Sequence, residues 1–464
     1  MRHHPAPLRS ALALLAAAAL TGCMQMAPTY ERPAAPVPAA FTDAPAGAGA
    51  TAAAELPWRD YFTDDTLRAL IAQALANNRD LRVAVLNIEA VRAQLALRRA
   101  DELPTVNAAL NAARQTGSSG KVVGAYSAGL GVTAYELDLF GRVRSLGDSA
   151  AAQLLASLQA RRAAQIALVA TVASQYLALV ADQELLALTQ GTLATRQESL
   201  RLTQLRVDNG ASSELDLRQA QTLVEAARAT QAQLQRQVQL DRNALTLLVG
   251  QALPAMAAAP RVDGIVLADL PAGLPSDVLL RRPDVQQAEQ LLIGANANIG
   301  AARAAFWPRI SLTASVGTAS TQLSDLFRDG AWSFAAQLLQ PIFDAGRNRA
   351  NLALAEVQRD VAVAQYERAI QAAFRDVADA LAGRATLGEQ LRATQAQAAA
   401  ESARLALVEL RFRNGASSSL ELLDAQRSQF AAQQALVQTQ LALLLNRVAL
   451  YRALGGGLDG PAAS

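Results

Sequence analysis

The chain has 464 residues, 52% hydrophobic but only 4% aromatic, and its 42 basic side chains nearly balance 40 acidic ones. This near neutrality gives no electrostatic basis for binding nucleic acid. Cys23 is the only cysteine, and the only histidines are His3 and His4. The body of the chain therefore lacks the thiols and imidazoles of most nucleophilic, general-base and zinc chemistry, and we expect no catalytic residue, metal or cofactor.

Residues 1–22 have the features of a signal peptide. Arg2 and Arg9 form a basic region that precedes an apolar segment. This segment, Ala11 to Leu20, is too short to span a bilayer. The segment ends in LTGC at Cys23, which resembles the lipobox of bacterial lipoproteins. The resemblance implies that Cys23 becomes the N-terminus and carries diacylglycerol and an N-acyl chain such as palmitate. Met24, rather than Asp, follows it, which implies the outer membrane. The alternative is an ordinary secretory signal.

The next segment, 23–57, is rich in Ala, Gly and Pro and predicts an extended tether between lipid and folded body. Trp58 to Phe62 is a candidate docking point for it. From Asp64 to about Ala100, apolar residues recur at helical spacing and predict one amphipathic helix. After Cys23 we find no apolar run of roughly 20 residues and expect no transmembrane helix.

Four segments alternate between apolar and small or polar residues, which predicts strands at 103–113, 124–138, 308–318 and 331–342. Aromatic residues lie at or near the strand ends: Tyr126, Tyr135, Phe306, Trp307 and Trp332. An apolar face opposite a small polar face is typical of membrane strands with lipid outside and water inside, and interfacial aromatics fit that arrangement. The alternative is a soluble sheet with one solvated face.

Two long segments, from about Arg142 to Val207 and from about Arg347 to Phe412, contain no proline and few glycines. An unbroken helix of that length would span roughly 100 Å. Each ends in Asn-Gly followed by Ser-Ser, and the two copies lie 205 residues apart. The glycines suit a helix end and the serines suit the N-cap of a returning helix.

The chain is therefore an internal repeat of two helical hairpins with four strands. The expected parts are a first repeat at 58–249 with its tip at 208–213, a connector at 250–281, a second repeat at 282–454 with its tip at 413–418, and a tail at 455–464. Four strands cannot close a barrel, and an open sheet edge in lipid leaves backbone groups unpaired. The chain must therefore oligomerise. Two copies would supply eight strands and a barrel filled by side chains, whereas three would supply twelve strands and an open lumen, which the small Ser, Gly and Thr residues of the polar face favour.

Several motifs resemble outer-membrane factors of the TolC superfamily, in the lipoprotein branch that contains OprM and NodT. They include TYERPAAPVP, LPAGLPSDVLLRRPDVQQAE, AAFWPRISLTASVG and QPIFDAGRNRA. The resemblance implies a homotrimer with a twelve-stranded outer-membrane β-barrel, a twelve-helix periplasmic α-barrel, and an equatorial belt. It also implies two partners, a periplasmic adaptor protein and an inner-membrane pump.

The same resemblance places the periplasmic aperture at Leu420, Asp424 and Arg427, which share one helix face. Their counterparts in the first repeat are the uncharged residues Leu215, Gln219 and Thr222. We expect the second hairpin to constrict the aperture and the first to supply wall and adaptor surface. The alternative is a local ion pair between Asp424 and Arg427 on a solvated face.

We expect the adaptor to contact the two tips at Asn209, Gly210, Ala211, Ser213, Asn414, Gly415, Ala416 and Ser418. Turn chemistry alone also explains these residues. The chain has no GxxxxGK[ST] motif, so a partner must supply energy. The expected function is a passive exit duct for small molecules in a tripartite efflux pump. The alternatives are a duct for type I protein secretion and a lipid-anchored coiled-coil scaffold without a pore.

Overall fold

The computed structural model describes residues 25–41, 56–116, 120, 122–254, 261–270 and 276–458. The predicted signal peptide and the lipidation site Cys23 lie outside these residues. The chain divides into two compact units. The first comprises Met1–Ala34, Asn87–Leu158 and Gln287–Glu367, and the second comprises Ala35–Leu86, Gln159–Gln286 and Arg368–Ser464.

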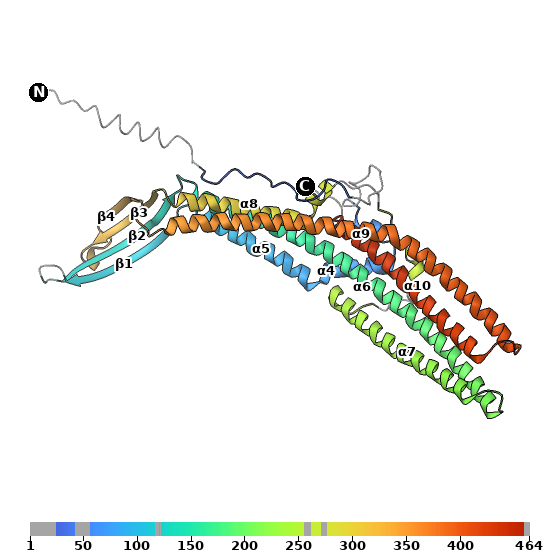
Figure 1. Cartoon of the computed structure of the whole chain (residues 1–464). Coiled ribbons are helices and arrows are strands. Elements are labelled where there is room, and N and C mark those ends of the chain that lie inside the picture. Colours follow the sequence, from blue (N-terminus) through green and yellow to red (C-terminus); the bar gives the residue numbers. More distant parts are fainter. Residues whose placement is uncertain are drawn as a thin grey trace, which may run out of the picture. The chain divides into compact units, whose positions relative to one another are not determined.

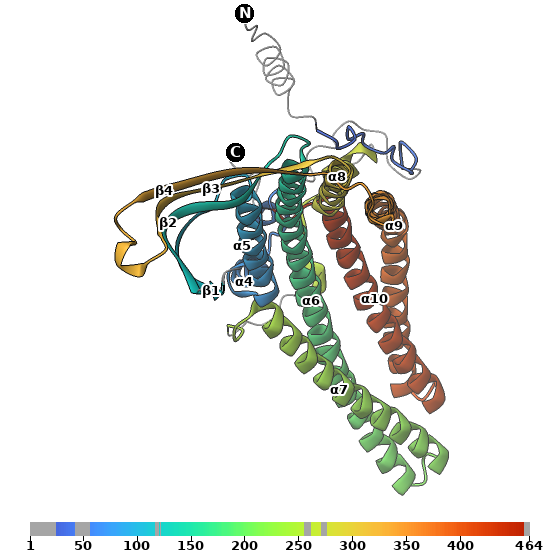
Figure 2. The same cartoon turned by 90° about the vertical axis from the view of Figure 1, so that its left-hand side faces the viewer.

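The first unit contains a four-stranded antiparallel sheet in the order β1-β2-β3-β4 (Figures 1 and 2). Its strands are β1 (Val106–Thr116), β2 (Val122–Leu137), β3 (Arg309–Ser320) and β4 (Gly330–Leu339), with the short helix η3 (Leu323–Asp325) between the last two. The expected number of strands is confirmed. Within the described ranges, no strand pairs with the outer edge of β1 or of β4, so the sheet is open.

Every strand boundary differs from the expectation by one to three residues, and the largest differences are at both ends of β1 and at the end of β4. β1 begins at Val106, three residues late, because Leu103 N donates to Ala100 O in the turn that ends the preceding helix, and Pro104 has no N–H to donate. β4 ends at Leu339 rather than at 342, since Pro341 cannot donate to a ladder.

One face of the sheet is apolar and exposed. Leu130, Val316 and Trp332 lie in register across three strands and are 52%, 63% and 80% exposed. On the opposite face, Ser315 and Ser333 pair through their hydroxyls at 2.7 Å. Exposed large apolar side chains in register need an apolar solvent or a partner, as membrane strands do.

β2 contains a bulge near its C-terminal end. Val132 pairs with Ala314, but the next pair is Tyr135 with Leu312. Ala134 inside the bulge has φ of +54° and its N–H donates to the Thr313 hydroxyl at 3.2 Å. A bulge of this kind bends and twists the strand where it meets the helices.

Within the predicted tether, the structure describes a segment at residues 25–34 that is held by α8. It lies along α8 (Pro283–Ala304) and is held by three α8 side chains spaced seven residues apart, Glu289, Asn296 and Arg303. Arg32 makes a bidentate ion pair with Glu289, with Nε–Oε1 and Nη2–Oε2 distances of 2.6 and 3.1 Å. The carbonyl oxygens of Pro28 and Met26 accept from the other two side chains. We call residues 25–34 the strap.

The long helices form two hairpins (Figures 1 and 2). α6 (Arg142–Asp208) and α7 (Glu214–Val249) form the first, and α9 (Arg347–Arg413) and α10 (Ser419–Ala453) the second. One correction concerns α6, which contains a stretch long and apolar enough by composition to cross a membrane. In this structure 61% of that stretch is buried, so its apolar residues serve helix packing.

The predicted helix from Asp64 to Ala100 is two helices, α4 (Asp65–Asn77) and α5 (Arg79–Ala100). Asn78 between them has extended backbone and caps α5, since its Oδ1 accepts from Leu81 N at 2.9 Å. Its Nδ2 donates to Leu248 O, at the end of α7, at 2.9 Å. A tertiary contact therefore breaks a helix that periodicity alone predicts as continuous.

The connector packs on the second unit. It contains the short helices η1 (Val262–Gly264) and η2 (Ser276–Arg281), and Val262 N donates to Glu184 on α6 at 2.8 Å. Beside it, α3 (Trp58–Tyr61) buries an aromatic cluster in which Tyr61 stacks on Tyr451 at 3.9 Å. The segment expected to dock is thus part of the core of this unit.

Candidate gate, docking tips and helix clamp

The two hairpin tips have the same backbone hydrogen bonds. In the first, Gly210 has φ of +70°, its N–H donates to Val207 O, and Ala211 N donates to Arg206 O. In the second, Gly415 has φ of +74° and its N–H donates to Phe412 O, while Ala416 N donates to Arg411 O. Both patterns are Schellman motifs, which end a helix and satisfy its last carbonyls.

Serine residues start both returning helices. The Ser213 hydroxyl accepts from Asp216 N at 3.1 Å, and the Asp216 carboxylate accepts from Ser213 N in a capping box. The Ser418 hydroxyl accepts from Glu421 N at 3.2 Å. The eight residues expected to contact an adaptor are all exposed: Asn209, Gly210, Ala211, Ser213, Asn414, Gly415, Ala416 and Ser418. Both tips are rigid turns that present small polar groups outward.

The expected gate residues lie within the first three turns of α10. Arg427 Nη2 lies 2.6 Å from Asp424 Oδ1, and Leu420 is 60% exposed. The local ion pair of the alternative interpretation is therefore present. Sequence reasoning missed Arg404 on α9, whose Nη2 lies 2.7 Å from Asp424 Oδ2. Asp424 thus joins α10 to α9.

The charged side chains at this site form ion pairs with one another. Arg404 above all, with Arg427, holds the pKa of Asp424 below its usual range, so the carboxylate is ionised at neutral pH. Arg404 also contacts Glu401 at 3.2 Å. Its counterpart in the first repeat is Ser199, so the repeat asymmetry that singled out Asp424 could also have identified Arg404. Solvent screens exposed pairs of this kind, so each contributes little to stability.

The two hairpins also touch each other near the tips. The Arg206 guanidinium lies 4.4 Å from the centroid of the Phe412 ring, and Gln426 Nε2 donates to the Ser199 hydroxyl at 3.2 Å. A cavity of about 570 Å³ remains between them, lined in part by Leu202 and Leu422. The contact between the hairpins near the tips is therefore partial.

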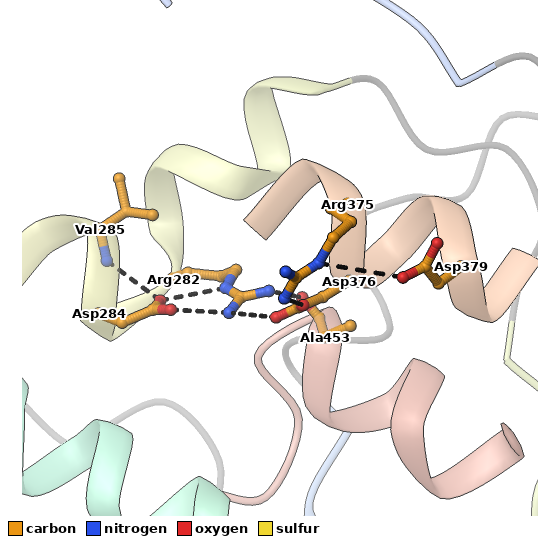
Figure 3. A network of polar contacts seen from close by, with 7 residues as sticks. All are labelled: Arg282, Asp284, Val285, Arg375, Asp376, Asp379 and Ala453. Atoms are coloured by element: carbon orange, nitrogen blue, oxygen red, sulfur yellow. Dashed lines mark hydrogen bonds and ion pairs between the residues drawn. The ribbon is translucent and has the colours of Figure 1, made fainter. Parts of the chain in front are cut away.

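A second charged cluster, which we call the clamp, consists of Arg282, Asp284 and Asp376 (Figure 3). Arg282, which is 11% exposed at the side chain, forms two hydrogen bonds with Asp284 at 2.7 and 3.0 Å. It also donates to Ala453 O at 3.0 Å and lies 3.4 Å from Asp376 on α9. One side chain therefore ties the start of α8 to α9 and to the end of α10.

The first repeat makes the equivalent contact without charge. Asn78 occupies the position that Arg282 has in the second repeat, and Leu248 O corresponds to Ala453 O. Residue 171, the counterpart of Asp376, is a threonine. The second hairpin is thus held by ion pairs between helices both near its tip and at its base.

A buried carboxylate pair joins α6 to α7. Asp241 is 4% exposed; its Oδ1 accepts from Gln175 and Gln237 at 3.1 and 3.0 Å, while its buried Oδ2 has no hydrogen-bond partner among the described residues. Burial, together with the adjacent Asp241 carboxyl, raises the pKa of Asp182 to about 7. A proton on Asp182 would supply the donor that Asp241 Oδ2 needs.

This pair predicts that stability depends on pH. Because the folded state holds the proton on Asp182 more tightly than the unfolded chain does, the stabilisation is present at pH 5 and is lost as pH rises through about 7. We expect the thermal midpoint of the detergent-solubilised protein to fall by several degrees between pH 5 and 8. Asp182→Asn should flatten that dependence, and Asp208→Asn, an exposed change on α6, should not. Parallel pH curves for wild type and Asp182→Asn would contradict this assignment.

No group of three or more His, Cys, Asp or Glu side chains that could hold a metal ion occurs in the part of the chain that the structure covers.

The comparisons agree with this geometry. The model of a family described as outer membrane efflux protein matches residues 70–251 and 274–456. The chain is 49% identical to the probable efflux pump outer membrane protein TtgC of Pseudomonas putida, over 97% of this chain and 96% of that one. It is 47% identical to the outer membrane protein OprJ of Pseudomonas aeruginosa, over 96% and 95% of the two chains.

Among solved structures, the open state of the Neisseria gonorrhoeae MtrE outer membrane channel superposes with a TM-score of 0.88 at 41% identity, covering 95% of this chain and all of that one. The family match spans both repeats, and the relatives are matched nearly end to end. The chain therefore belongs to the outer membrane efflux protein family, whose members are channels of efflux pumps.

Proposed function

We propose that three copies of this chain form the outer-membrane exit duct of a tripartite efflux pump. The observation that carries the proposal is the open sheet with an exposed apolar face. In a trimer the free edge of β4 pairs with β1 of the next chain, which closes a twelve-stranded barrel and satisfies the backbone groups of both edges. The long hairpins continue the duct into the periplasm.

We propose that the duct is passive and that its periplasmic end is gated. An adaptor protein binds the two exposed tips, and an inner-membrane pump supplies the energy. Relatives are named for toluene, solvent and antibiotic efflux, which supports small, largely apolar molecules as the cargo. Leu420 and the Asp424 ion pairs form the constriction, and adaptor binding opens it by separating α10 from α9.

We propose further that Cys23 carries the acyl anchor. The strap supports this, because it holds Gln25, two residues after the anchor position, by a hydrogen bond to Asp148 at 3.2 Å. Asp148 lies in the second turn of α6, close to the end of β2. The anchor would then lie beside the sheet that spans the membrane.

A deletion strain tests the proposed function. We expect the strain to become several-fold more susceptible to lipophilic antibiotics and solvents, to keep normal protein secretion, and to be restored by the gene in trans. Lost secretion with unchanged susceptibility would instead indicate a type I secretion duct. A folded monomer in detergent that conducts no ions in planar bilayers would indicate a scaffold.

A further inference from the structure

The first unit contains a polar cavity of about 400 Å³ that the duct function does not use. It lies between the end of α5, the start of α6 and the strap. Its polar lining side chains are Gln25, Arg99, Glu102, Asp138, Arg144 and Asp148. This volume is within the range of small-ligand sites in proteins, roughly 300–1,000 Å³.

The cavity lies at the helix end of the membrane sheet. Glu102 precedes the first residue of β1 by four positions, and Asp138 directly follows the last residue of β2. In the same unit, Phe140 stacks on Trp307 with ring centroids 5.1 Å apart, and Trp307 remains 45% exposed. Aromatic residues at the ends of membrane strands mark the boundary between lipid and water. The cavity is therefore at the level of lipid headgroups.

The strap places the cavity on the lipid side of the chain. Gln25 lines it and donates to Asp148 Oδ2 at 3.2 Å. Two further residues, about 7 Å of extended chain, lead back to Cys23. Acyl chains on Cys23 would enter the leaflet beside the cavity opening. This step rests on the outer-membrane placement and on lipidation, but not on the gate.

The charged side chains of the cavity have both signs, and two of them have no ion-pair partner among the described residues. The guanidinium groups of Arg99 and Arg144 make no ion pair within the described ranges, although Arg144 N donates to Asp138 Oδ2 at 2.8 Å. Glu102 and Asp148 line the same cavity. Two guanidinium groups suit a phosphodiester, and carboxylates suit a primary ammonium. Three carboxylates in the walls oppose a purely anionic headgroup.

We propose that this cavity binds the headgroup of a zwitterionic phospholipid with a primary amine, of the phosphatidylethanolamine type. The phosphate lies between Arg99 and Arg144, and the ammonium group contacts Glu102 and Asp148. The bound lipid fills the space between the acylated N-terminus and the sheet, and it anchors each chain at a fixed depth.

Native mass spectrometry of the delipidated full-length protein tests this proposal. Dioleoyl phosphatidylethanolamine, phosphatidylcholine or phosphatidylglycerol is added, with inorganic phosphate and glycerophosphoethanolamine as soluble competitors. We expect one phosphatidylethanolamine per chain, with an affinity at least tenfold lower in Arg99→Gln/Arg144→Gln, because that variant loses both charge-assisted contacts to the phosphate. The control Arg236→Gln/Arg242→Gln removes the same charge from exposed positions on α7.

A second variant, Glu102→Gln/Asp148→Asn, should shift the preference from phosphatidylethanolamine to phosphatidylglycerol. Equal lipid retention by wild type and by the arginine variant would overturn the proposal, as would equal affinity for phosphatidylglycerol in the wild type. Displacement of the lipid by inorganic phosphate alone would instead identify a site for free anions. These experiments measure lipid binding and not export or conductance. Absence of the lipid site can therefore be distinguished from absence of the proposed duct.

Discussion

Replacing Asp424 and Arg427 together by alanine is expected to raise the single-channel conductance of the purified protein in planar bilayers severalfold. The structure gives the reason: Asp424 holds α10 to α9 through Arg404 at 2.7 Å and pairs with Arg427 at 2.6 Å. Removing both side chains frees Arg404 from its contact with α10. Solvent screens each pair, so each alone is weak, but the three chains of the proposed trimer lose them together.

The internal repeat supplies a matched control for the gate. Gln219→Ala with Thr222→Ala changes the equivalent positions of the first hairpin, which carry no charge, and should leave conductance unchanged. Arg404→Ala alone should reproduce part of the increase, because it breaks the contact between helices while Arg427 remains. Unchanged conductance in Asp424→Ala/Arg427→Ala would remove these residues from the gate.

Replacing Arg282 by methionine should have the largest effect on stability. The Arg282 side chain is nearly buried, and it contacts Asp284, Asp376 and Ala453 O at once (Figure 3). Its loss leaves two carboxylates close together without their cation, although Asp376 keeps an exposed contact with Arg375. We expect the free energy of unfolding to fall by about 3 kcal/mol, near the lower end of values for a broken buried ion pair because Asp284 is 42% exposed.

Thermal unfolding followed by circular dichroism at the helix band measures this loss. Asn78→Ala is the matched control, because Asn78 makes the neutral version of the same contact and caps α5. Its loss should cost about 1 kcal/mol, the typical value for an N-cap. Equal midpoints for Arg282→Met and wild type would show that the clamp does not hold the base of the second hairpin.

Local interactions made the hairpins predictable. A helix end depends on residues within one turn, so Asn-Gly followed by serine placed both Schellman turns, at Gly210 and Gly415, within the expected tips. Helix length followed from the absence of proline. Strand alternation also depends on neighbours two residues apart, and it predicted the apolar face that the structure exposes.

Contacts between distant residues were not predictable in the same way. Arg404 and Asp424 are 20 residues apart on antiparallel helices, and sequence spacing does not say which side chains meet across two helices. Asn78 lies in a periodic segment, yet its bond to Leu248 O, 170 residues away, divides that segment into two helices. Here a long-range hydrogen bond outweighs local helix propensity.

The sequence by itself determined the duplicated hairpins, the four strands and the open edges that require other copies, because all of these follow from short-range periodicity and from the geometry of a sheet. Only the tertiary structure decided which charges hold the helices together and where the strap lies. Those choices depend on long-range packing, in which Arg404, Arg282 and Glu289 find partners far along the chain.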